Sequence, residues 1–193
     1  TATDGGTVLL GAFGTQGDII QHGGLISASG DVVMLADRNV NLNGQINADG
    51  ELAVLAGFNQ LATAGGNILL GATSSVTAGD ISLTADRDTG TGAFSTGNVS
   101  QQAGSTLQTG NDFLINASGN IDMLGTVVGN AAGRTNLRAG FNNTTGTEQA
   151  FTGAHVTANN LQANGGSVSI QATAGINAVV QSAGVVGANI NNS

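Results

Sequence analysis

The chain of 193 residues contains no cysteine, proline, lysine, tryptophan or tyrosine, and only 3% of its residues are aromatic. Without cysteine the fold cannot depend on disulfides, which suits many secreted proteins and is also compatible with a reducing compartment. Without large aromatic rings, a broad globular interior is hard to fill. Since 40% of the residues are nevertheless apolar, the composition favours a thin core of small aliphatic side chains over a disordered chain.

Positive charge is scarce as well, because the chain has twelve acidic residues but four arginines, and its formal net charge is -8. Phosphate recognition needs clustered basic side chains, whereas the arginines are dispersed along the chain. They are Arg38, Arg87, Arg134 and Arg138. The same shortage argues against attachment to anionic lipid, and no apolar run approaches the roughly 18 residues that cross a membrane. We therefore expect a soluble chain with no nucleic-acid partner and no membrane insertion.

What the sequence does contain is a recurring phrase: an aliphatic residue, a small residue and a glycine, followed by an aliphatic-x-aliphatic-x-Ala strand. Two copies run from Ile26 to Ala36 and from Ile46 to Ala56, and a third starts at Leu61. Self-similarity at a period of about 20 residues indicates a solenoid, whose repeats bury their apolar side by stacking on one another. No stretch keeps apolar residues at helical spacing over three turns, so the predicted fold is an all-β solenoid.

We interpret residues 1–193 as a single solenoid domain of about eight coils of irregular length. The first strands of the coils are expected near Val8, Val32, Leu52, Ile68, Ile81, Phe113, Thr135 and Val168. In each strand the first, third and fifth residues form an inward face, and the final alanine leaves room for a corner. Glycines before the strands are expected to provide a positive φ or a tight bend. Examples are Gly30, Gly50, Gly66, Gly79 and Gly110.

Two long spacings between strands predict projecting loops near residues 87–97 and 141–153. Both segments are polar and rich in glycine and threonine. Insertions project from a solenoid and often carry its binding surfaces. A tolerated surface excursion is the simpler interpretation of each loop.

The runs Gly24–Asp37 (GLISASGDVVMLAD) and Gly79–Asp86 (GDISLTAD) resemble the repeats of filamentous-haemagglutinin-type exoproteins, adhesins exported by two-partner secretion. The resemblance covers most of the chain and implies a right-handed parallel β-helix, secretion to the cell surface, and an adhesive or structural role. Expected partners are the flanking parts of a longer exoprotein and host or cell-surface glycans. The family's amino-terminal secretion domain carries Asn-Pro motifs, so this proline-free chain resembles the repeat region instead.

Candidate catalytic residues are few. Polysaccharide lyases and hydrolases built on parallel β-helices gather acids and bases on one face, and the best grouping here is Asp86-Arg87-Asp88, echoed by Asp37-Arg38. Without lysine, tyrosine or tryptophan there is little to stack a sugar ring or to act as a base near neutral pH. A corner ion pair is the simpler interpretation, so we expect no catalytic residue. A polysaccharide-acting enzyme that uses Asp86 and Asp88 is the alternative.

The sequence supports a metal site as weakly as it supports a catalytic site. Residues 86–91 offer carboxylates and carbonyls to calcium, but the Gly-Gly-x-Gly-x-Asp nonapeptide of calcium-loaded β-rolls does not occur. Nor do acids recur at matching positions from coil to coil, which favours solvated acidic corners. His22 and His155 are far apart in the sequence, with no cysteine or second histidine nearby. We interpret both as surface histidines and expect no metal and no cofactor.

Two further patterns concern the surface. Phe58 and Phe141 occupy matching Ala-Gly-Phe-Asn phrases directly after a strand, where core or corner packing is favoured over an apolar stripe for a lateral partner. The N-glycosylation pattern matches five asparagines, Asn98, Asn116, Asn142, Asn143 and Asn191. In a chain rich in asparagine and threonine such matches arise readily by chance. Of the five, Asn142 and Asn143 fall in a predicted exposed loop.

The two ends of the repeat array carry the main functional prediction. No capping helix, charge cluster or proline is evident before Thr7 or after Ile190, and residues 176–190 are strand-like and nearly chargeless. Uncapped strand rows pair with further strands, either in other copies end to end or in a longer solenoid. We therefore predict an extracellular structural or adhesive element and not an enzyme.

An ice-binding solenoid is the third alternative. It needs a flat face of regularly spaced threonines, and the candidate threonines do not share one register. They are Thr63, Thr77, Thr84 and Thr109.

Overall fold

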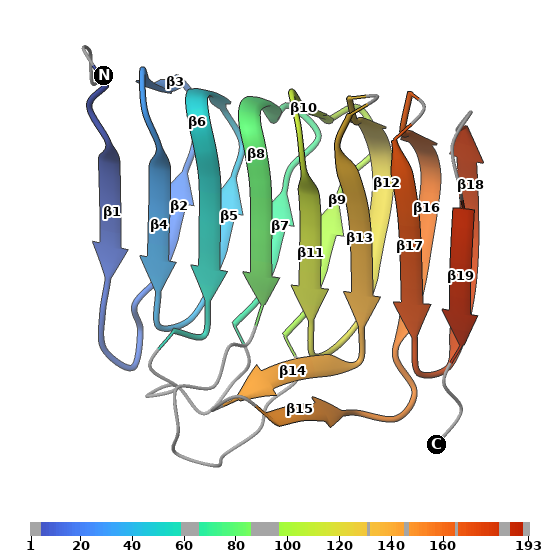
Figure 1. The fold of residues 1–193 in the computed structure, drawn as a ribbon. Helices are drawn as coiled ribbons and strands as arrows, with labels where there is room; N and C mark the ends of the chain where they lie inside the picture. The colour runs from blue at the N-terminus through green and yellow to red at the C-terminus, as the bar shows by residue number, and fades with distance from the viewer. Residues whose placement is uncertain are drawn as a thin grey trace.

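The computed structural model describes residues 5–58, 66–85, 97–130, 132–144, 147–164, 166–181 and 186–190. This part of the chain consists of strands and turns, and none of its elements is a helix long and apolar enough to span a bilayer. Seventeen strands form one parallel sheet, while β14 (Phe141–Thr144) and β15 (Thr147–Ala150) form a separate antiparallel pair. Figure 1 shows the parallel strands as a row of stacked coils.

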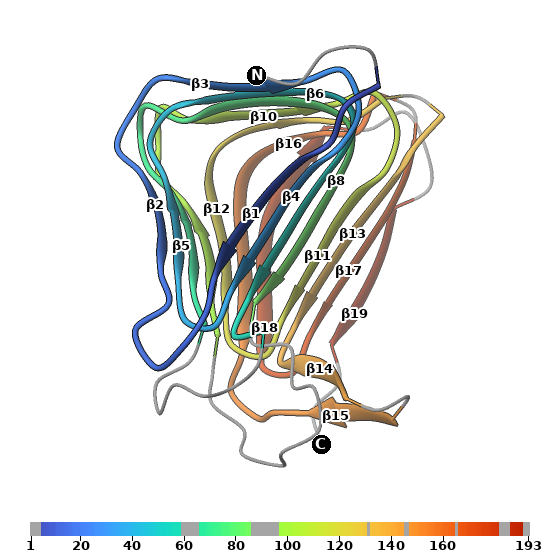
Figure 2. The ribbon, with the colours of Figure 1, turned by 90° about the vertical axis from the view of Figure 1, so that its left-hand side faces the viewer.

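The parallel sheet winds into three faces, which Figure 2 shows as the sides of a triangle. The first face consists of β1 (Val8–Ala12), β4 (Val32–Ala36), the second half of β6 (Gln45–Ala56) and of β8 (Ser75–Ala85), β11 (Phe113–Ala117), β13 (Arg134–Ala139), β17 (Ser167–Ala172) and β19 (Val186–Ile190). The second face consists of β2 (Ile19–Gln21), β5 (Val40–Leu42), β7 (Ile68–Leu70), β9 (Val99–Gln101) and the first parts of β12 (Ile121–Val128), β16 (His155–Gln162) and β18 (Gly175–Gln181). The third face consists of β3 (Leu25–Ala28), the first halves of β6 and β8, β10 (Thr106–Thr109) and the last parts of β12, β16 and β18.

The repeated phrase predicts the inward pattern of the first face correctly. In β4 burial alternates along the strand, and Val32, Met34 and Ala36 are fully buried. The closing alanines align from strand to strand, as Ala36 does with Ala12 and with Ala56. Together the inward residues of the three faces form one narrow aliphatic core that runs along the stack. The all-β, parallel, solenoid-like architecture is therefore confirmed.

The prediction that Ile68 opens a first-face strand is wrong. Ile68 begins β7, which aligns with Val40 and Val99 on the second face, and β8 follows β6 directly on the first face. The last first-face strand is instead β19, which aligns with β17. All three faces need alternating aliphatic residues, so the period of two does not reveal to which face a short strand belongs.

Several glycines before the first-face strands are needed for space and not for φ. A positive φ or a tight bend was expected at positions such as Gly30, Gly50 and Gly79, and the glycines with positive φ lie elsewhere. A Cβ added to Gly30 would lie 2.8 Å from the Gly5 carbonyl oxygen, and one on Gly79 would lie 2.8 Å from the Asp49 carbonyl oxygen. At Gly30 and Gly79 successive coils thus approach so closely that only a hydrogen atom fits, whereas a Cβ on Gly110 would lie 3.6 Å from its nearest neighbour, an ordinary contact.

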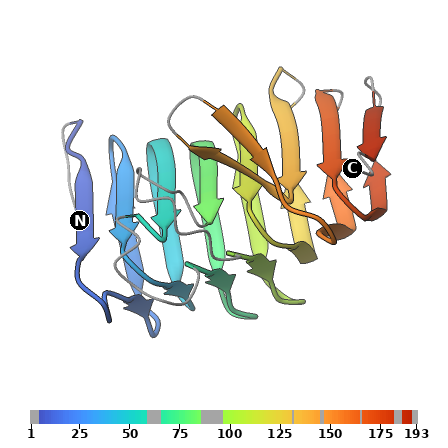
Figure 3. The same cartoon turned by 90° about the horizontal axis from the view of Figure 1, so that it is seen from below.

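The β14–β15 hairpin lies within the segment 141–153, where a projecting loop is predicted. Its register pairs Phe141 with Ala150 and Thr144 with Thr147. Figure 3, seen from below, shows the hairpin lying across the ends of the coils, and β14 contacts β11. The other predicted loop, residues 87–97, lies outside the described residues except for Gly97.

Candidate functional site

The outward residues of the first face change character along the stack. In β1, β4 and β6 the second and fourth positions are apolar: Leu9, Gly11, Val33, Leu35, Ala53 and Leu55. In β8, β11, β13 and β17 the same positions are mostly polar: Ser82, Thr84, Leu114, Asn116, Asn136, Arg138, Ser169 and Gln171. We call these two sets the apolar zone and the polar zone. The inward register continues unchanged through both, so the difference concerns the surface alone.

The apolar zone is most exposed at the N-terminal end of the stack. Leu9 is 66% exposed, and the neighbouring Phe13 is 61% exposed. The Phe13 ring lies over Gly11, because a Cβ on Gly11 would be 2.7 Å from a ring carbon. The rings of Phe13 and Phe58 lie 6.3 Å apart at an interplanar angle of 53°. Phe58 is half-buried at the corner after β6, and its ring borders the apolar zone.

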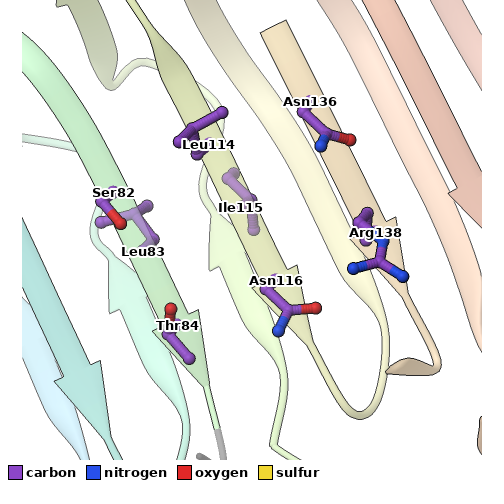
Figure 4. Close-up of a pocket in the computed structure, with 8 residues that line it drawn as sticks. All are labelled: Ser82, Leu83, Thr84, Leu114, Ile115, Asn116, Asn136 and Arg138. Atoms are coloured by element: carbon purple, nitrogen blue, oxygen red, sulfur yellow. The ribbon is translucent and has the colours of Figure 1, made fainter. Parts of the chain in front are cut away.

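The polar zone contains a shallow hollow of about 220 Å³. Figure 4 shows its lining residues on three adjacent strands, β8, β11 and β13. In the register of the sheet, Ser82, Leu114 and Asn136 form one row across these strands. Thr84, Asn116 and Arg138 form the second row. The lining thus contains two hydroxyls, two amides and a guanidinium, together with the apolar residues Leu83, Leu114 and Ile115.

Two amide oxygens at the hollow lack hydrogen-bond partners. Asn116 Oδ1 and Asn136 Oδ1 are both buried, and neither accepts a hydrogen bond. An unsatisfied buried carbonyl oxygen costs about 1–3 kcal/mol, so natural structures rarely leave one without a reason. Figure 4 shows the Asn116 side-chain nitrogen on the side of β8 and its oxygen on the side of β13.

Arg138 borders the hollow and connects it to the hairpin. Its Nε donates a hydrogen bond of 2.9 Å to Gln171 Oε1, and its guanidinium lies 4.8 Å from the centre of the Phe141 ring. Burial lowers the pKa of Arg138 from its usual value, although an arginine remains charged at any physiological pH. Phe141 is buried at 6% exposure, which agrees with the predicted corner packing.

An asparagine ladder that the sequence interpretation overlooked crosses the corner before the second face. Both Nδ2 and the backbone N–H of Asn98 donate to Asn67 Oδ1, at 3.2 and 3.0 Å, and the same arrangement joins Asn67 to Asn39. The Asn120 N–H in turn donates to Asn98 Oδ1 at 2.8 Å. The available signal was an asparagine directly before each short aliphatic strand, as in Asn39-Val40. This ladder connects the coils but offers no open site.

Acids do recur at matching positions, contrary to the sequence-based expectation. Asp31, Glu51, Asp80 and Asp112 precede successive first-face strands, and the side-chain oxygen of each of Asp31, Asp80 and Asp112 accepts a backbone N–H from the next coil. Burial, together with the charges of Asp31 and Asp80, raises the pKa of Glu51. A hydrogen bond from the Arg134 guanidinium lowers the pKa of Asp112. The sequence interpretation overlooked this column because the coils differ in length.

The Asp37-Arg38 corner also differs from its predicted form. Arg38 forms an ion pair with Asp18 of the preceding coil, and its Nε donates to Asp18 Oδ1 at 2.7 Å. Asp37 is only 1% exposed and accepts a hydrogen bond from the Gly14 N–H. The predicted corner ion pair on the outside is therefore wrong in placing Asp37 at the surface, and the ion-pair partner of Arg38 is Asp18. The other acids of this prediction, Asp86 and Asp88, lie outside the described residues, as does the candidate calcium segment.

The remaining candidates do not converge on a site. His22 and His155 are both exposed, and among the described residues no three histidine, aspartate or glutamate side chains are grouped to hold a metal ion. Thr77 and Thr84 lie on different faces, and Thr109 is buried. The register therefore does not combine these threonines into an ice-binding surface, and Thr63 lies outside the described residues.

The N-glycosylation matches are distributed over different environments. The Asn98 amide is part of the ladder, and Asn116 lines the hollow. Asn142 and Asn143 lie in β14, where the side chains are outside the described part of the chain. Asn191 lies outside it altogether.

Comparisons of the chain with protein families, with characterised proteins and with solved structures find no match.

Proposed function

We propose that this chain is an extracellular structural or adhesive β-solenoid, a right-handed parallel β-helix of about eight coils of the filamentous-haemagglutinin type. Its ends take further coils by strand stacking, supplied by other copies of the chain or by flanking parts of a longer exoprotein. Its role is not enzymatic, and it needs no cofactor. The supporting observation is the state of the core at the two ends of the stack.

The core is closed along the stack and open at both described ends. Inward residues of the middle strands, such as Leu52 and Leu83, are fully buried. In contrast, most inward residues of the first coil and several inward residues of β18 are only partly buried. These residues are Val8, Leu10, Ile19, Ile26, Ile176, Ala178 and Val180. A further coil on either end would bury this apolar surface at about 25 cal/mol per Å².

The backbone of the first coil supports the same proposal. The Val8 N–H donates to the Asp31 carbonyl oxygen, and the Ala12 carbonyl oxygen accepts from the Asp37 N–H. Because parallel strands bond through alternate residues, the N–H groups of Leu9 and Gly11 point to the opposite edge of β1. Among the described strands, β4 is the one that pairs with β1, so this opposite edge is available to a strand of another coil.

The proposal predicts that the purified chain associates end to end into rods as its concentration rises. Electron microscopy and analytical ultracentrifugation would measure the rods, which fibre diffraction should show with a repeat of about 4.8 Å along the axis. Leu9→Pro should shorten the rods, because proline removes an N–H from the open edge without removing an internal bond of β1. Leu9→Ser, which keeps that N–H, is the matched control. A chain that stays monomeric at every concentration would contradict the proposal.

A further inference from the structure

We infer that the hollow in the polar zone is a binding subsite for a neutral, hydroxyl-rich sugar ring. This inference rests on the adhesive part of the proposed function and assigns it to a specific place. Three observations support it: the chemistry of the lining, the two unsatisfied amide oxygens, and the paired backbone beneath the hollow.

The polar side chains of the lining match hydroxyl groups, and apolar residues such as Leu114 lie among them. Ser82 and Thr84 contribute hydroxyls that donate and accept, and Asn116 and Asn136 contribute amides with one face of each kind. The terminal torsion of asparagine has broad, roughly two-fold preferences, so each amide can rotate to exchange its NH₂ and its oxygen. A sugar hydroxyl, which both donates and accepts, fits either orientation. Asn116 Oδ1 and Asn136 Oδ1, which are buried and accept no hydrogen bond, would reach donors on a bound ring only through such a rotation, which places the NH₂ groups in their present positions.

The position of the hollow disfavours a peptide ligand. An extended peptide gains affinity by adding a strand to a free sheet edge. Here the central strand of the hollow, β11, pairs with β8 on one side and with β13 on the other. Recognition must therefore come from side chains such as Asn116, which stand out from the middle of the sheet.

Size and charge narrow the ligand further. A volume of about 220 Å³ lies below the ~300–1,000 Å³ of typical small-molecule pockets, so it suits one ring of a longer glycan. The guanidinium of Arg138 already contacts Gln171 Oε1 and the Phe141 ring. The net charge of -8 disfavours the approach of an acidic sugar. The subsite therefore favours a neutral hexose.

Saturation-transfer NMR with the methyl glycosides of glucose, galactose and mannose tests this inference. We expect saturable binding of at least one of them, weakened about three- to tenfold by either Asn116→Ala or Asn136→Ala, the loss expected for one hydrogen bond. Asn41→Ala is the matched control, because Asn41 faces outward on the second face, away from the hollow. It should bind like the unmodified chain. Circular dichroism would verify that each variant is folded.

Several results would overturn the inference. They are the absence of binding up to the solubility limit of each glycoside, binding that survives both amide substitutions, and binding of methyl glucuronide alone. Saturable binding of an unstructured Ser/Thr/Asn-rich peptide in place of the glycosides would assign the hollow to protein recognition instead. Rod formation is measured without sugar, so failure of the subsite and failure of end-to-end stacking remain distinguishable.

Discussion

The apolar and polar zones of the first face share one inward pattern and differ in most of the side chains that they present to solvent. Leu35 and Thr84 occupy equivalent outward positions in β4 and β8, while the residues beside them point into the same aliphatic core. The comparison teaches that stacking places strict demands on the inward positions and leaves the outward ones free. Function in such a fold can therefore vary along the length of the rod without any change in architecture.

The largest expected effect on stability comes from truncating a core side chain, which should destabilise the chain equally beneath either zone. Leu52→Ala and Leu83→Ala each truncate a fully buried side chain, one under each zone. Each should lower the free energy of unfolding by about 2–5 kcal/mol through lost burial and a residual cavity. Urea denaturation followed by circular dichroism would measure the loss. If one substitution were silent, the core would not be continuous beneath the two zones.

The asparagine ladder should matter next, because it joins coils of the apolar zone to coils of the polar zone at the corner before the second face. Asn98→Ala removes the hydrogen bonds to Asn67 and leaves the Asn120 N–H without its acceptor. We expect a loss of about 1–3 kcal/mol, chiefly from the unsatisfied groups. The same denaturation experiment applies, with Asn41→Ala as the outward control. Equal stability of the two variants would show that the ladder adds nothing beyond the sheet.

Acidification should change the contributions of Glu51 and Asp112 to the free energy of unfolding in opposite directions. The pKa of Glu51 is raised above its ordinary value of 4.5, so its contribution to stability is full below that value and is lost as the pH rises through the folded pKa. Glu51→Gln should therefore stabilise the chain at pH 7 by less than about 1 kcal/mol, after allowance for solvent screening. The gain should vanish on acidification. Urea denaturation between pH 4 and pH 7 measures it.

Asp112, which directly precedes β11 of the polar zone, is expected to show the opposite pH dependence. Its pKa is lowered from 3.8 by Arg134, so the stability that it contributes is present above 3.8 and is lost as the pH falls through the folded pKa. Arg134→Gln should reduce this contribution at neutral pH and partly flatten the acid side of the stability curve, because the backbone N–H of residue 134 still donates to Asp112. An unchanged curve would mean that the ion pair is screened by solvent.

The smallest expected effect on stability comes from exchanging the surface chemistry of the zones. Leu35→Thr makes the apolar zone resemble the polar one, and Thr84→Leu does the reverse. Both should change the free energy of unfolding by no more than about 0.5 kcal/mol, as is usual for surface positions. Binding of a hydrophobic dye should fall with the first and rise with the second. A large loss of stability would show that the outward positions are also constrained.

Much of this fold is predictable because one rule repeats. Alternation in segments such as Val32–Ala36 predicts the inward residues, and each copy of the phrase supports the others. The assignment of Ile68 failed because a second-face strand obeys the same alternation. The acid column was missed for a related reason, since Glu51 and Asp80 become neighbours only once coils of different length are in register.

The sequence by itself determined the all-β solenoid class, the inward face of the first sheet and its closing alanines, because stacking requires the same residue types in every coil. Only the tertiary structure decided which side chains meet across coils. Ser82, Asn116 and Asn136 are far apart in the chain, yet they share one hollow because the register of β8, β11 and β13 places them side by side. That register depends on the lengths of the coils, and these lengths vary because the repeated phrase does not fix the number of residues between its copies.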